Sequence, residues 1–158
     1  MFRPMRRYKQ QLSADECFEI LINEKRGVLS LVGDEGYPYG VPINHYYNSD
    51  EGKIYFHGAK QGHKIDAVRK NDKACFTVFD SGFKKPDDWA LNIKSVIVFG
   101  KIKPVEDERK AEEICRKLCG KFTDDEEYID SEIKNALSRV ECLEMTVENI
   151  TGKLVNEK

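Results

Sequence analysis

Short runs rich in β-branched and aromatic residues recur along the chain, many with alternating apolar and polar positions, and they predict β-strands. Clusters of glycine, proline, asparagine and acidic residues separate these runs and predict turns. One run contains Pro38 and Pro42, and because proline cannot donate to a strand ladder, we expect that strand at a sheet edge or at a bulge. The six strands expected cover residues 27–32, 37–47, 53–57, 74–79, 93–105 and 139–147.

The residues within and between these runs also predict burial, a bulge and the connecting loops. Residues 27–32 are almost continuously apolar, so we expect both faces of this strand to be buried. Gly100 interrupts the long fifth strand and predicts a bulge or a bend. Residues 80–88 are polar and include Gly and Pro, which predicts a loop that is mobile or forms a rim. Residues 149–158 are polar and are expected to form a short tail.

Helical periodicity separates some of the strands. Ser13 and Glu16 form a capping box for a helix that should end near Asn23. Strands follow one another in hairpins and do not alternate with helices. The predicted fold class is therefore mainly β (α+β), a single domain whose antiparallel sheet closes as a small barrel with helices packed outside. The helices expected cover residues 14–23, 63–70, 106–119 and 130–137.

The composition is that of an ordinary soluble globular domain. A formal net charge of −2 argues against a nucleic-acid-binding domain, because such domains are usually strongly basic. No apolar run is long enough to span a membrane or to form a secretory signal. The five cysteines are odd in number and scattered, which suits reduced thiols in the cytoplasm. Cys115 and Cys119 share a helix face, but no nearby His or Cys completes a tetrahedral set, so we expect no metal site.

Residues 52–73 carry the clearest chemical signal in the chain. They combine a strand, a corner containing Gly58 and Gly62, and a basic helix. Free N–H groups at a glycine-bearing helix start, with added cations, are how proteins hold a phosphate. This pattern predicts a phosphate site, although a basic surface helix after an ordinary turn would read the same way. The charge after His57 is five minus two, or +3, from Lys60, Lys64, Arg69, Lys70 and Lys73 against Asp66 and Asp72.

Three separated blocks of sequence carry a resemblance to a known family. They are YPYGVPINHYY, FHGAKQGHKIDAVRKN and KSVIVFGKIKPV, and in this order they resemble the FMN-binding split-barrel family related to pyridoxamine 5′-phosphate oxidase. Within that family the chain is most similar to the nitroimidazole-resistance (Nim-like) branch. The resemblance covers roughly residues 6–153 and implies one domain, 1–158, folded as a six-stranded antiparallel split β-barrel. It also implies a homodimer with two FMN molecules at the subunit interface.

The resemblance implies which positions contact FMN. Backbone groups of the edge strand would line the isoalloxazine ring at Val41, Pro42, Ile43 and Asn44. The corner would follow the ribityl chain at His57, Gly58, Ala59 and Lys60. The phosphate would be held by Gly62, His63 and Lys64, in agreement with the site argued from charge. A strand of the partner subunit would face the flavin with Lys94, Ser95 and Val96.

The three histidines have different expected roles. His57 matches a histidine that lies close to the cofactor in the Nim-like branch, and it is the candidate catalytic residue; the alternative is a half-buried structural histidine. His63 stands where family members commonly have Arg or Lys, so we expect phosphate affinity either to be lower or to fall as pH rises, unless Lys60 and Lys64 compensate. His45 has no motif partner and is expected to be structural. No arginine-rich segment like that of the true oxidases follows Lys153, so we do not expect vitamin B6 oxidation.

The predicted function is an FMN-dependent oxidoreductase that passes electrons from reduced flavin to a small organic acceptor, as nitroimidazole reductases do. The flavin would carry the chemistry, while the protein binds and orients it. Two alternatives remain open. The chain could store, sense or deliver flavin without turnover, or its barrel could bind haem or a deazaflavin. The sequence identifies neither the electron donor nor the acceptor.

Overall fold

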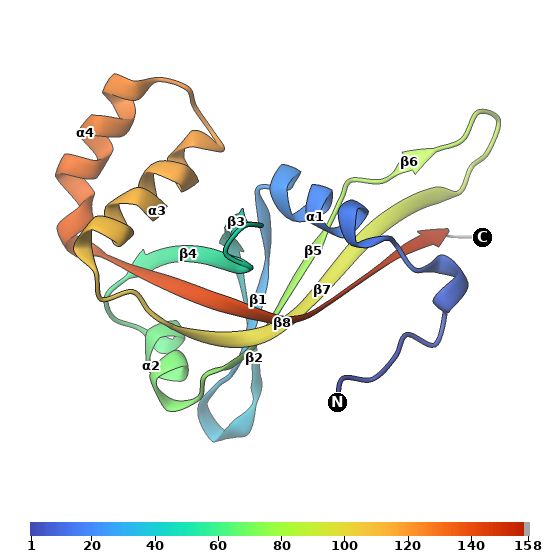
Figure 1. Ribbon diagram of the computed structural model, residues 1–158, viewed down its shortest axis with the longest axis horizontal. Helices are drawn as coiled ribbons and strands as arrows, with labels where there is room; N and C mark the ends of the chain where they lie inside the picture. The colour runs from blue at the N-terminus through green and yellow to red at the C-terminus, as the bar shows by residue number, and fades with distance from the viewer. Residues whose placement is uncertain (157–158) are drawn as a thin grey trace.

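The computed structural model describes residues 1–156 and places eight strands in one curled antiparallel sheet (Figure 1). The order across the sheet is β2-β1-β5-β7-β8-β4-β3, and β6 pairs with β7 beside this path. The barrel-like antiparallel fold predicted from the sequence is confirmed. Six of the strands are longer than three residues, as expected. The strands are β1 (Arg26–Val32), β2 (Pro38–Asn44), β3 (Tyr46–Asn48), β4 (Lys53–Ala59), β5 (Lys73–Phe79), β6 (Phe83–Lys84), β7 (Leu91–Pro104) and β8 (Val140–Asn156).

Four α-helices surround the sheet, each near its predicted position. The capping box is present, because Ser13 Oγ accepts from the Glu16 amide (3.2 Å) and the Glu16 carboxylate accepts from the Ser13 amide (2.9 Å). Asp125 caps the fourth helix by accepting from the Tyr128 amide (3.1 Å), so this helix begins at residue 126, before the predicted residue 130. The helices are α1 (Ala14–Asn23), α2 (His63–Lys70), α3 (Glu108–Gly120) and α4 (Glu126–Ala136), with 3-10 turns at Tyr8–Gln10, Asp34–Gly36 and Leu137–Arg139.

Two strand features follow directly from proline and glycine. β2 is an edge strand, as its prolines predict, and Pro42 lies opposite Val28 of β1. The expected strand 37–47 divides at His45, whose backbone N–H instead donates to a carbonyl outside the sheet. β7 has a register shift at Gly100, which confirms the predicted bulge. The sheet can therefore curl while its long central strands remain paired.

β1 is buried on one face, so the prediction of burial on both faces was wrong. Leu29 and Leu31 are buried, whereas Val28 and Ser30, which alternate with them, are partly exposed. A continuous apolar run indicates two covered faces only when a layer lies on each side. Here one chain supplies a core on one side of β1.

β8 extends to Asn156, so the predicted polar tail was also wrong. Residues 149–156 pair with β7 from Phe99 to Asn92. Ile150 and Leu154 pack against the core, but the Thr, Gly and Lys between them do not give the alternating apolar pattern from which a strand is predicted. The last two residues of the expected tail, 157–158, lie outside the described residues.

The alternation of side chains divides the interior into two cores. Within the curled sheet, Phe56 of β4 packs with residues of β1, β5 and β7. On the other face of β4, Tyr55 packs with α3 and α4, so the two-helix hairpin has a core of its own. The largest fully buried members of the first core include Leu21, Leu29, Phe76 and Leu143, and the second contains Ile114, Leu118, Ile129 and Cys142.

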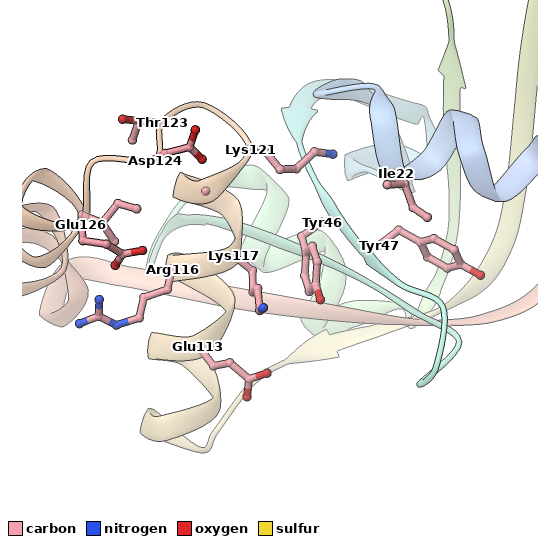
Figure 2. Close-up of a pocket in the computed structure, with 12 residues that line it drawn as sticks. Ile22, Tyr46, Tyr47, Glu113, Arg116, Lys117, Lys121, Thr123, Asp124 and Glu126 are labelled. Atoms are coloured by element: carbon pink, nitrogen blue, oxygen red, sulfur yellow. The ribbon is translucent and has the colours of Figure 1, made fainter.

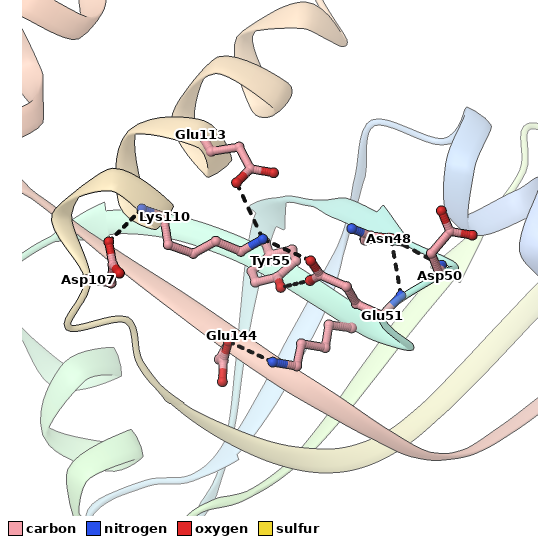
Figure 3. A network of polar contacts seen from close by, with 9 residues as sticks. Asn48, Asp50, Glu51, Tyr55, Asp107, Lys110, Glu113 and Glu144 are labelled. Atoms are coloured by element: carbon pink, nitrogen blue, oxygen red, sulfur yellow. Dashed lines mark hydrogen bonds and ion pairs between the residues drawn. The ribbon is translucent and has the colours of Figure 1, made fainter.

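A polar network attaches the α3–α4 hairpin to β4 (Figure 3). Lys110 of α3 forms ion pairs with Glu51 (3.0 Å) and Glu113 (3.5 Å). The buried Tyr55 hydroxyl donates to the Glu51 carboxylate, and burial together with this carboxylate raises the Tyr55 pKa. Lys53 pairs with Glu144 of β8 (3.2 Å). The hairpin is thereby fixed to the strand that leads into the candidate site.

Candidate functional site

The predicted corner is formed where β4 ends and α2 begins. Gly62 has φ = 121°, a conformation that favours glycine, and it provides no side-chain cap for α2. Its carbonyl accepts from the amides of Ile65 (2.9 Å) and Asp66 (3.1 Å). Within residues 1–156, no acceptor is present for the backbone N–H groups of His63 and Lys64. Two donors are therefore free at a helix N-terminus, where an anion is favoured.

Lys64 adds a cation to these donors. Its ammonium group lies over Gly58, so closely that a Cβ at that position would collide with it. The side chain is half-buried, and burial lowers the Lys64 pKa. No carboxylate within the described part of the chain forms an ion pair with it. An uncompensated, partly desolvated cation beside free amides fits a phosphate.

His57 lies on the strand that enters this corner, opposite Cys142 of β8. Its Nδ1 atom is buried and has no hydrogen-bond partner in the described chain. Burial lowers the His57 pKa, and the charge of Lys64 lowers it further. The ring is therefore neutral near pH 7, with one nitrogen available to a ligand atom.

The other two histidines are engaged by the protein. The His63 ring stacks on Tyr39, with 4.0 Å between ring centroids, and its Nε2 accepts from the Asp34 amide (3.3 Å). Its imidazole is thus held by the β1–β2 turn, while its backbone N–H remains at the corner. His45 is fully buried and its Nε2 contacts the Leu21 carbonyl (2.7 Å). His45 is structural, as expected.

The predicted ring-binding strand lies near the corner. Val41, Pro42, Ile43 and Asn44 belong to β2, which pairs with β1 on one side and, within residues 1–156, with no strand on the other. β2 also contacts β4, so the two margins of the curled sheet approach one another. Ala59, Lys60 and Gly62 are exposed at the corner itself. These segments can face one ligand within a single chain.

Within one chain, the predicted flavin-facing segment lies far from the corner; it consists of Lys94, Ser95 and Val96. Ser95 lies opposite Lys153 on β8, whereas Gly58 lies opposite Glu141. The separation along β8 is 153 − 141 = 12 residues, or about 40 Å of strand at roughly 3.3 Å per residue. Figure 1 shows the same division, with α2 at one end of the molecule and the β6 arm at the other. Lys94 also forms an ion pair with Glu16 of α1 (3.2 Å).

Sequence reasoning missed a cavity between α3 and β3 (Figure 2). It has a volume of about 570 Å³ and is lined in part by Tyr46, Tyr47 and Lys117. Lys121 lies at its edge and donates to the carbonyls of Glu24 (2.6 Å) and His45 (2.9 Å). Burial lowers the Lys121 pKa to about 8. The available signals were the adjacent tyrosines and two lysines four residues apart, Lys117 near the end of a predicted helix and Lys121 just beyond it.

The described residues offer little support for other kinds of site. No three metal-ligating side chains within residues 1–156 form a group that could hold a metal ion. No helix in the same residues is long and apolar enough to cross a membrane. The five cysteines are free thiols.

The curled antiparallel sheet and its strand-to-helix corner define a split-barrel protein with a candidate phosphate site. The chain belongs to the pyridoxamine 5′-phosphate oxidase family, whose model matches residues 13–154. The family resemblance drawn from the sequence is thus confirmed. A search among curated proteins finds no match.

Solved structures share the fold at low sequence identity. A candidate 5-nitroimidazole antibiotic resistance protein from Bacteroides thetaiotaomicron VPI-5482 is 21% identical, with a TM-score of 0.81 over 92% of this chain and 87% of that one. An FAD-binding protein from Mesorhizobium loti is 23% identical, with a TM-score of 0.69 over 92% and 97%. An FAD-binding protein from Mycobacterium smegmatis is 21% identical, with a TM-score of 0.67 over 94% and 99%. At these identities the likeness establishes the fold alone.

Proposed function

We propose that this protein is an FMN-dependent oxidoreductase that passes electrons from reduced flavin to a small organic acceptor of the nitroaromatic kind. One observation carries the proposal: the half-buried, unpaired Lys64 lies over Gly58 beside two free amides. This arrangement fits the flavin phosphate. Family membership and the FAD-binding relatives support a flavin as the ligand.

Each part of the corner has a role in this proposal. Lys64 and the amides of His63 and Lys64 hold the phosphate, and the β2 edge offers main-chain groups to the flat ring. When bound, the flavin would supply the electron-transfer chemistry. His57 is the proposed catalytic residue, because its neutral ring can orient the acceptor through a hydrogen bond. Five free thiols support a reducing, cytoplasmic setting.

The first test is the visible absorption spectrum of the purified protein and of the supernatant after heat denaturation. A yellow protein that releases FMN is the expected result. The loaded protein, reduced without oxygen, should then be reoxidised by a 5-nitroimidazole faster than free reduced FMN is. His57→Ala should retain the flavin and slow this step. A colourless protein that takes up no added flavin would refute the proposal, and an unchanged rate in His57→Ala would remove the catalytic role.

We also propose a homodimer in which the partner supplies its residues 94–96 to the flavin. The outer face of the sheet supports this, since Phe79, Ile97 and Phe99 are exposed there on neighbouring strands. Contiguous apolar surface of this kind usually marks an interface. Phe99 is 40% exposed, so burying the rest of its side chain in both copies contributes about 1–2.5 kcal/mol, from roughly 1.5–3 kcal/mol for a whole side chain.

Light scattering coupled to gel filtration tests the homodimer. The wild type should have twice the mass of the chain, and Phe99→Asp should shift it to monomer with loss of flavin. Ile22→Asp, which alters an exposed apolar residue on α1, is the matched control and should remain dimeric. A monomeric wild type that binds flavin would contradict the dimer.

A further inference from the structure

Two buried thiols meet where α3 packs on β8, and the proposed flavin site does not use them. Cys115 of α3 and Cys142 of β8 are 4% and 1% exposed, and their Sγ atoms lie 3.6 Å apart. The Cys142 sulfur also lies 3.6 Å from the carbonyl oxygen of Ala111, one turn earlier on α3. The two cysteines are 142 − 115 = 27 residues apart and enclose α4 between them, so the fold itself brings them together.

This arrangement is close to that of a disulfide. The bond is about 2.05 Å long, so the two sulfurs must approach by roughly 1.5 Å to form it. A buried cysteine usually serves as a small apolar residue, and its reactivity decides whether it does more. Here the sulfur of each cysteine has a second thiol in contact, which is the partner that oxidation requires.

A cavity gives a small oxidant a path to the pair. It has a volume of about 730 Å³ and lies between the base of the α3–α4 hairpin and the start of β8 (Figure 1). Ala111 and Cys142 belong to its lining, together with the exposed Glu108 and Lys134. A water molecule takes up only about 30 Å³ of liquid volume. Hydrogen peroxide is little larger, so this cavity can admit it.

The two thiols differ in reactivity. The hydrogen bond between them lowers the pKa of Cys115, whereas the same hydrogen bond, followed by burial, raises the pKa of Cys142. The thiolate is the form of cysteine that attacks an oxidant. Cys115 is therefore the attacking residue, and Cys142 is the thiol that resolves the product.

We propose that Cys115 and Cys142 form a reversible disulfide when the protein is exposed to hydrogen peroxide. The Cys115 thiolate attacks one peroxide oxygen, the O–O bond breaks, and the departing hydroxide takes the Cys142 proton and becomes water. Cys115 is then a sulfenic acid. The Cys142 sulfur attacks the Cys115 sulfur, the S–O bond breaks, and the hydroxyl group leaves and is protonated to water. In total the two thiols lose two electrons and two protons, and the peroxide becomes two waters.

The disulfide has a structural consequence that does not depend on flavin binding. It ties α3 covalently to β8 and closes a loop that contains α4. Such a link stabilises a protein mainly by constraining its unfolded chain. Intracellular disulfides are usually transient and redox-sensing, and small thiols reverse them by exchange. The pair is thus a peroxide-responsive clamp on the α3–α4 hairpin.

Peptide mapping of the peroxide-treated, full-length protein tests the link. The protein is reduced, freed of reductant and exposed in its folded state to a slight molar excess of hydrogen peroxide. Titratable thiols should fall by two, from five to three, with a loss of two hydrogens from the intact mass. Trypsin cuts after Arg116 and Arg139, so Cys115, Cys119 and Cys142 fall in separate peptides. The linked pair should be Cys115 with Cys142, and dithiothreitol should restore both.

Variants test the order of the steps and the clamp. Cys119→Ser, one turn after Cys115, is the matched control and should form the same link. Cys142→Ser should stop at the sulfenic acid of Cys115, which dimedone traps, and circular dichroism checks that this variant is folded. The oxidised wild type should melt about 4–16 °C above the reduced protein.

Three results would count against the proposal. Five titratable thiols after peroxide treatment of the wild type, or a link that joins Cys119, would overturn the disulfide. A folded Cys142→Ser that gains no dimedone label on Cys115 would overturn the order of attack. Equal melting temperatures for the oxidised and reduced wild type would overturn the clamp.

Discussion

Two regions of this molecule each place a partly buried lysine near a histidine, yet they differ in what those groups contact. In the interior, Lys121 donates to two backbone carbonyls, and His45 Nε2 forms a hydrogen bond with a third backbone carbonyl. At the corner, Lys64 has no ion-pair partner in the described chain, and His57 has a buried, unpartnered Nδ1. In both regions burial lowers the pKa of the lysine and of the histidine.

Burial and a shifted pKa therefore do not distinguish a binding site from a structural polar cluster in this protein. Hydrogen-bond satisfaction does. A polar group that the fold satisfies contributes to stability, whereas one left unsatisfied costs free energy until a ligand arrives. His45 also has an unpartnered nitrogen, Nδ1, but its ring is fully buried. Of these two regions, the corner is the one that combines unsatisfied polar groups with exposed backbone, at Gly62.

The largest expected effect is on flavin affinity when the corner lysine is reversed in charge. Lys64→Glu should weaken FMN binding at least ~100-fold, about 3 kcal/mol, because a charge-assisted hydrogen bond becomes a repulsion. Calorimetric titration measures it. Arg69→Glu makes a similar charge change on the same helix, at an exposed position away from the corner, and should change affinity less than about threefold. Equal losses in both variants would mean that general surface charge binds the phosphate.

Acid should destabilise the protein through the interior histidine. Burial, followed by the charge of Lys121, lowers the His45 pKa from 6.5 to about 4. The unfolded chain takes up this proton below pH 6.5 while the folded chain resists it, so stability present at neutral pH is lost as pH falls. The loss should approach about 3 kcal/mol at pH 4. Chemical denaturation at several pH values should show a shallower decline in His45→Gln, and parallel curves would remove His45 as the cause.

Lys121→Met should cost stability and leave flavin binding intact. It leaves the carbonyls of Glu24 and His45 without their donor, at a cost of about 2 kcal/mol. Urea denaturation gives the free energy of unfolding, and FMN titration gives the affinity. Exposed Lys117→Met, one turn earlier on α3, is the control and should be neutral. A loss of flavin affinity in Lys121→Met would show that the two regions are coupled.

The sequence predicted the parts of both regions that depend on neighbours in the chain. Gly58, Gly62 and the basic helix placed the corner correctly, and the Ser13 capping box set the start of α1. The sequence did not predict contacts between side chains that are far apart in the chain. His63 was expected to hold phosphate with its side chain, but its ring is held by Asp34, 29 residues away. Lys121 donates to the carbonyl of His45, 76 residues earlier in the chain, and no local sequence pattern predicts such a contact.

The smallest effect gives the sharpest contrast between the two lysines. Lys64→Met removes a half-buried cation that has no ion pair, so the flavin-free protein should gain up to about 1 kcal/mol of stability while losing flavin affinity. Lys121→Met should lower the stability of the protein. The same type of substitution would therefore change the free energy of unfolding in opposite directions in the two regions. Thermal unfolding of the flavin-free proteins measures both, with Arg69→Met as the surface control. If Lys64→Met instead destabilises the flavin-free protein as much as Lys121→Met does, then Lys64 has a structural partner and the corner is another satisfied cluster.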